Sequence, residues 1–127
     1  MLSFIATAGT MAIVDVLWIG LVAKDLFDKL IGNLLVQPVR VFPALLFYVM
    51  YVTAIYLYGV LQAKDSKNAL LRGASLGFVC YATYEFTNWA ILKGWPGLMV
   101  AVDLSWGIFI TSISAFAGRW VLDRLKR

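Results

Sequence analysis

Apolar residues fill four long runs of the chain, and short polar segments separate these runs. The runs cover residues 2–23, 41–62, 69–92 and 98–118. The first holds about 22 residues, which as an α-helix extend for about 33 Å, enough to cross a hydrocarbon core of about 30 Å. The pattern therefore predicts an all-α fold, an integral membrane four-helix bundle in which each run crosses the bilayer once.

The segment after the first run follows a different pattern. Between about residues 25 and 36, apolar side chains recur at helical spacing among charged ones, at Leu26, Phe27, Leu30, Ile31, Leu34 and Leu35. This spacing predicts a short amphipathic helix lying in the membrane interface. Gln37 and Pro38 should end it. We therefore expect a single transmembrane domain over residues 1–127, with one interfacial helix after the first span.

Composition agrees with a chain embedded in lipid. Of its 127 residues, 62% are hydrophobic and 14% are charged, whereas a soluble domain has roughly a quarter of its residues charged. The net charge of +4 comes from Lys and Arg at segment ends, so we expect the bilayer as partner and no nucleic acid. With no His and one Cys, the ligands of zinc, haem and thiol-redox motifs are missing, and we predict no metal and no cofactor.

The distribution of basic residues predicts the orientation. With four spans, both termini and the loop after the second span share one side, which holds seven of the 11 Lys and Arg residues. The positive-inside rule places this side in the cytoplasm. We expect a multi-pass protein with cytoplasmic termini, in a bacterial inner membrane or its organelle equivalent. The seven residues are Lys64, Lys67, Arg72, Arg119, Arg124, Lys126 and Arg127.

Small residues mark expected helix contacts. Gly73 and Gly77 form a GxxxG pair on the third span, and Gly107, Thr111 and Ala115 repeat every four residues on the fourth. Small side chains let helix backbones approach closely inside a membrane. Both faces are therefore predicted to pack tightly.

Other residues follow ordinary membrane-protein patterns. Trp89, Trp95 and Trp120 fall near the predicted bilayer boundaries, where rings with a polar edge are favoured. Cys80 lies inside an apolar run and is expected to serve as packing. Lys93, just beyond the third span, could fold back onto a carboxylate or extend to the interface.

Three acidic residues lie inside the predicted spans: Asp15, Glu85 and Asp103. Each should face the bundle interior, because an ionised carboxylate in lipid is unfavourable. With helices of alternating direction, all three fall roughly 8 to 12 Å below the same boundary, so we expect one acidic layer. Carboxyl groups gathered in a low dielectric should not all be ionised, and such a layer suits a proton or a cation.

Aromatic and polar residues accompany the acids. Trp18 and Trp106 each follow an aspartate by three residues, in similar local sequences, which forms a weak repeat on helices of opposite direction. Polar residues at spacings of three and four within residues 81–88 form a stripe that should face the same interior. The candidate binding residues are Asp15, Trp18, Tyr81, Tyr84, Glu85, Asn88, Asp103 and Trp106.

These stretches also carry a family resemblance. Asp15-Val-Leu-Trp18, Tyr81-Ala-Thr-Tyr-Glu-Phe-Thr-Asn88, Leu92-Lys-Gly-Trp95 and Asp103-Leu-Ser-Trp106-Gly107 resemble the signature stretches of the predicted bacterial membrane protein family called domain of unknown function 2177. The order and spacing extend over nearly the whole chain. The family pattern has Asp where this chain has Glu85. The resemblance implies a fold of about four transmembrane helices and no established activity.

The sequence is compatible with several functions. The acidic layer could bind or transport a proton, a cation or a lipid head group, or its side chains could only lock the bundle through hydrogen bonds. Alternatively, the protein is a structural accessory subunit that packs against other membrane subunits or forms a homo-oligomer. A membrane enzyme acting on lipid is a further alternative. Without His, a nucleophile–base pair or a metal cluster, we lean against an enzyme and name no catalytic residue.

Overall fold

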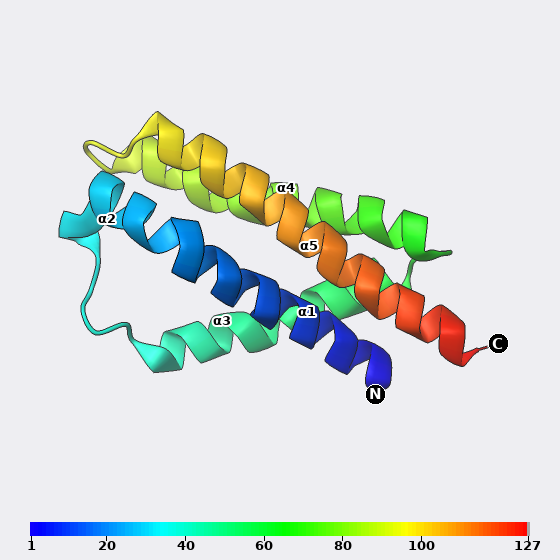
Figure 1. The fold of residues 1–127 in the computed structure, drawn as a ribbon. Helices are drawn as coiled ribbons and strands as arrows, with labels where there is room; N and C mark the ends of the chain where they lie inside the picture. The colour runs from blue at the N-terminus through cyan, green and yellow to red at the C-terminus, as the bar shows by residue number, and fades with distance from the viewer. Residues whose placement is uncertain (127) are drawn as a thin grey trace.

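The computed structural model describes residues 1–126, nearly all of them in helices. In chain order its elements are α1 (Leu2–Trp18), the π-helical η1 (Ile19–Ala23), α2 (Lys24–Ile31), the 3-10 turn η2 (Gly32–Leu34), α3 (Val41–Ala54), the π-helical η3 (Ile55–Leu61), α4 (Ser66–Ile91) and α5 (Gly97–Leu125). Figure 1 shows α1, α3 with η3, α4 and α5 as four long rods. The predicted all-α membrane bundle is confirmed.

Three helical stretches are long and apolar enough to cross a membrane: Leu2–Leu34, Val41–Leu61 and Gly97–Leu125. The fourth rod, α4, has 26 residues, which is long enough to cross. Its polar residues lower its hydropathy, and it is not among the three. Because α4 packs along α5 (Figure 1), its polar side chains can be shielded by protein. Four crossings stay a prediction.

Successive rods run in opposite directions (Figure 1). The N-terminus, the connection from η3 to α4 and the end of α5 lie at one end of the bundle, which we call the terminal end. α2 and the connection from α4 to α5 lie at the opposite end, the loop end. This arrangement fits an even number of crossings. The cytoplasmic placement of the terminal end stays a prediction, and Arg127, one of its counted charges, lies outside the described residues.

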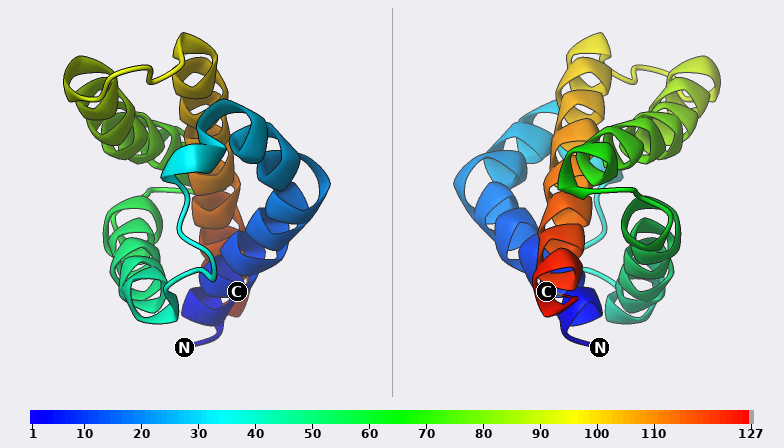
Figure 2. Two further views of the ribbon diagram at one scale, coloured as in Figure 1. Left: turned by 90° about the vertical axis from the view of Figure 1, so that its left-hand side faces the viewer. Right: turned by 90° about the vertical axis from the view of Figure 1, so that its right-hand side faces the viewer.

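The first rod bends after α1, so that α2 lies across the loop end (Figure 2). The bend coincides with η1, where the backbone adopts the wider π spacing, a common cause of helix bending. α2 and the residues after it pack their apolar side chains, Ile31 among them, against Trp95, Met99 and Val100. The predicted amphipathic helix after the first span is therefore present, and its helical turns end at Leu34.

Small residues bring α4 and α5 to backbone contact. A Cβ atom added to Gly73 would lie 2.7 Å from the carbonyl oxygen of Thr111 and 3.0 Å from Cβ of Ala115. One added to Gly77 would overlap the carbonyl oxygen of Gly107. The GxxxG pair thus meets the small-residue face of α5, and the predicted close packing is confirmed.

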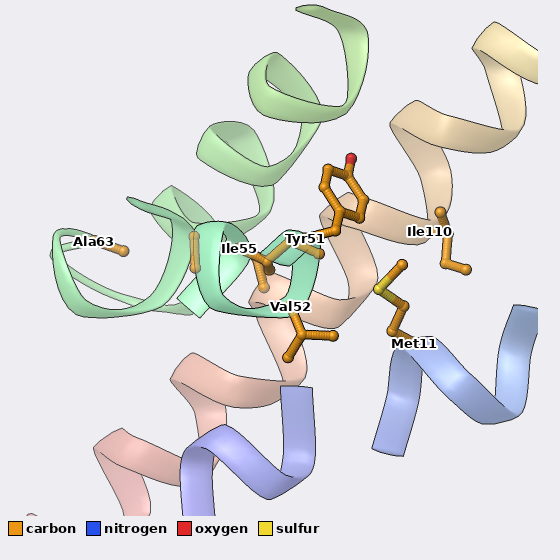
Figure 3. Packing of buried hydrophobic residues seen from close by; sticks show 8 residues of the cluster. Met11, Tyr51, Val52, Ile55, Ala63 and Ile110 are labelled. Carbon is orange, nitrogen blue, oxygen red and sulfur yellow. The ribbon is translucent and has the colours of Figure 1, made fainter. Parts of the chain in front are cut away.

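Side chains from all four rods form the main apolar core (Figure 3). Met11 of α1, Ile55 of η3 and Ile110 of α5 are almost wholly buried. Tyr51 of α3 joins this core and also shares a hydrogen bond of 2.6 Å with the hydroxyl of Thr111. The core therefore holds α3 against α5 by both apolar and polar contacts.

Arg119 connects α5 to the end of the second rod. Its guanidinium donates hydrogen bonds to the carbonyl oxygens of Val60 (3.2 Å), Ala63 and Lys64 (2.9 Å), and its Nε pairs with Asp123 at 2.8 Å. The last carbonyl groups of a helix lack partners within the helix, so Arg119 caps η3. It does not end its own helix, which continues past the predicted span limit at residue 118 to Leu125.

Candidate functional site

Glu85 of α4 is the most deeply buried acidic side chain of the described residues, with no exposed area. Its Oε2 accepts a hydrogen bond of 2.8 Å from Nε1 of Trp95. Its Oε1 is also buried and has no hydrogen-bond partner in the described part of the chain. A buried polar atom without a partner is unfavourable and rare in folded proteins. Oε1 is therefore an atom that a proton or a ligand would stabilise.

Asp103 of α5 interacts with Glu85. The two carboxyl groups lie within hydrogen-bonding reach of each other, so they can share a proton. Within residues 1–126, the ion pair between Arg119 and Asp123 at the terminal end is the single one formed. Glu85 and Asp103 thus form a carboxyl pair with no cationic side chain of the described chain paired to it.

Asp15 of α1 has a different environment, because two aromatic donors hold it. Tyr48 donates a hydrogen bond to Oδ2, and Nε1 of Trp106 donates one of 3.3 Å to Oδ1. Trp106 also stacks on Trp18, with ring centroids 4.4 Å apart and planes inclined by 8°. The two Asp-x-x-Trp stretches therefore meet between α1 and α5. Both oxygens of Asp15 are satisfied, whereas only one oxygen of Glu85 has a hydrogen-bond partner.

The polar stripe of α4 does not turn as a whole toward the interior. Glu85 is buried and Tyr81 is half-buried against Gly107, but Tyr84 is 55% exposed. Consecutive residues of a helix point about 100° apart, so Tyr84 and Glu85 cannot both face α5. The expected inward orientation of Tyr84 is wrong. Asn88, one turn further, is partly exposed.

A groove of about 510 Å³ lies between α3 and α4. Its lining is mostly apolar and aromatic and includes Phe47 and Met50 of α3 and Val79 and Tyr84 of α4. These four side chains are exposed on the outside of the bundle, the surface that lipid covers in a membrane. Asp103 is the one acidic residue of the lining. The groove thus gives the carboxyl pair an opening toward the bilayer.

Trp95 and Tyr48 donate hydrogen bonds to acidic side chains, and neither role was predicted from the sequence. Trp95 was expected at a bilayer boundary, yet it is only 7% exposed and donates to Glu85; Trp89, at 56% exposed, fits the boundary position. Trp95 follows Glu85 by only ten residues, across the turn after α4. This short separation is the one feature of the sequence that could have suggested the contact. Tyr48 lies in a helix without charged residues, and nothing in its local sequence indicated Asp15 as its partner.

Replacement of Trp95 with phenylalanine should reduce the free energy of unfolding by about 2 kcal/mol, because Glu85 then loses its donor while it stays buried. The free energy can be measured by denaturant titration in mixed micelles. Trp89→Phe is the matched control on an exposed ring and should change stability by less than about 0.5 kcal/mol. Equal effects of the two substitutions would show that the hydrogen bond between Trp95 and Glu85 contributes little to the free energy of unfolding.

The fold defines the class of this protein: an integral membrane protein built as a four-helix bundle. A family model described as "Predicted membrane protein (DUF2177)" matches residues 1–120, so the chain belongs to this family and the resemblance is confirmed. The comparison with curated proteins finds no match, and neither does the comparison with solved structures.

Proposed function

We propose that this protein binds a proton or a cationic group within the membrane, at the carboxyl pair of Glu85 and Asp103. The observation that supports this function is the unpartnered Oε1 of a fully buried Glu85 beside a second carboxyl group. Two ionised carboxyl groups repel strongly in a low dielectric. The pair therefore needs a proton or a cation. If the pair had a purely structural role, its oxygens would be expected to have hydrogen-bond partners within the protein, as both oxygens of Asp15 do.

The geometry of access supports reversible binding. Asp103 borders a groove that opens on the outside of the bundle, whereas Glu85 does not line this groove and is fully buried. An incoming proton or cation would meet Asp103 first and Glu85 second. Glu85 lies on α4 and Asp103 lies on α5. One copy of the chain therefore supplies the whole pair, and neither a second copy nor another membrane subunit is needed to form it.

Infrared spectroscopy of the protein in nanodiscs tests whether the carboxyl pair holds a proton, and calorimetry with methylammonium tests whether it binds a cation. At neutral pH we expect the C=O band of a protonated carboxylic acid, identified by its shift in heavy water, and its loss in Asp103→Asn. Methylammonium should remove the band from the wild type. Asp28→Asn, which changes an exposed acid of α2, is the matched control, and this variant should keep the C=O band. Absence of the band, together with equal methylammonium binding by wild type and Asp103→Asn, would refute the proposal.

A further inference from the structure

Building on that proposed function, we infer that the cationic group belongs to a lipophilic amine from the bilayer. Its hydrocarbon tail would lie in the groove between α3 and α4, and its ammonium group would bind Asp103. Three observations lead to this class of ligand: the shape and lining of the groove, the position of its single carboxyl group, and the absence of a paired cation beside that group in the described chain.

The lining matches a hydrocarbon tail. The groove has a volume of about 510 Å³, within the range of about 300 to 1,000 Å³ that is typical of small-molecule sites. Phe47, Met50 and Val79 line it and are exposed to the surrounding lipid, so a tail can enter sideways without crossing a polar barrier. Lipid tails are themselves apolar, and the groove by itself would hardly distinguish the ligand from them. Selectivity must come from the head group.

The charge of the site favours an ammonium head group. Asp103 is the acidic residue of the groove lining, and its carboxyl group lies beside that of the fully buried Glu85. An anionic head group would be repelled, and a neutral one would leave the carboxyl pair uncompensated. A primary ammonium group carries one positive charge and three N–H donors. The aromatic rings of Tyr51, Tyr81 and Tyr84, which also line the groove, can stabilise a cation over their faces.

The same lining argues against a divalent metal ion as the ligand. Hard cations such as calcium take six or more oxygen ligands, and magnesium also requires a full oxygen shell. The groove offers a single carboxylate among mainly apolar and aromatic side chains, and Oε2 of Glu85 is engaged by Trp95. An organic cation, which brings its own apolar surface, fits this surrounding better.

The test compares three probes on the full chain in zwitterionic nanodiscs by native mass spectrometry: dodecylamine, dodecanol and methylammonium. The wild type should bind dodecylamine on the order of tenfold to a hundredfold more tightly than dodecanol, since only the amine forms a charged hydrogen bond. Asp103→Asn should lose this preference. Val79→Trp should fill the groove, weaken dodecylamine on the order of tenfold, and leave methylammonium binding unchanged.

Val16→Trp is the matched control, because Val16 on α1 is also an exposed valine of a membrane helix, 65% exposed against 58% for Val79. It should bind all probes like the wild type, and circular dichroism should show that every variant is folded. If Val79→Trp and Val16→Trp bind dodecylamine equally, or if dodecanol binds as tightly as the amine, the lipophilic amine is refuted while methylammonium binding at Asp103 still stands. If Asp103→Asn changes the binding of neither cation, cation binding at the carboxyl pair is refuted, and if the C=O band is absent too, the proposed function falls as well.

Discussion

Replacement of Gly77 with valine is expected to prevent the bundle from folding stably. A Cβ atom at this position overlaps the carbonyl oxygen of Gly107 and lies 2.9 Å from Oγ1 of Thr111. The first of these atoms belongs to the backbone of α5, so rotation of a side chain cannot relieve the overlap, and the two helices must separate. α4 and α5 form the most extensive helix pair of the bundle. We expect a loss of about 3 kcal/mol or more in the free energy of unfolding.

Gly9→Val provides the matched control for this prediction. Gly9 also lies in a long apolar helix, α1, but a Cβ atom there would meet nothing within 4 Å. This substitution should change stability by less than about 1 kcal/mol. Denaturant titration in mixed micelles, followed by tryptophan fluorescence, measures both variants. Similar stabilities of Gly77→Val and Gly9→Val would mean that α4 and α5 are not in backbone contact.

Replacement of Arg119 with alanine is expected to lower the free energy of unfolding by about 3 kcal/mol. The guanidinium satisfies carbonyl groups of Val60, Ala63 and Lys64 at the end of η3 and pairs with Asp123. Without it, these carbonyl oxygens lose their donor in a part of the protein where Val60 and Ala63 are buried. The end of η3 should therefore loosen from α5. Hydrogen exchange of the amides in residues 55–61 would report this local change.

Arg124→Ala is the matched control on the same helix, because Arg124 is exposed and its guanidinium lies over the ring of Trp120, 4.9 Å from the centroid. Its loss should change stability by about 0.5 kcal/mol. Asp123→Asn separates the two roles of Arg119, because it weakens the ion pair and keeps the hydrogen bonds to the carbonyl groups of η3. We expect it to lower the free energy of unfolding by about 1 kcal/mol. An equal loss in Asp123→Asn and Arg119→Ala would assign the effect to the ion pair.

Much of the fold could be predicted from local patterns. The run over residues 41–62 corresponds to α3 and η3, and the run over residues 69–92 corresponds to α4. Small residues on α4 and α5 correctly indicated tight packing. The limit predicted at residue 118 did not coincide with a helix end, because a helix can continue beyond the hydrocarbon core into the polar region, and α5 extends to Leu125.

The candidate site could be predicted only in part. Asp15, Glu85 and Asp103 stood out because acidic side chains are unfavourable inside apolar helices, and the structure places Asp103 beside Glu85. The expected single layer divides into two environments, however. Asp15 is satisfied by Tyr48 and Trp106, whereas Glu85 keeps an unpartnered oxygen. The donors lie on other elements than the acids they hold, so no local sequence pattern linked them.

The sequence by itself determined that this protein is a helical membrane bundle and which acidic residues its apolar segments contain. These properties follow from single segments, because each membrane helix satisfies its own backbone hydrogen bonds and its hydropathy is a local quantity. Only the tertiary structure decided that Trp95 faces Glu85, that Tyr84 turns outward, and that Asp103 opens onto a groove between α3 and α4. These properties depend on contacts of a few ångströms between different helices, and such contacts are set by how the whole bundle packs.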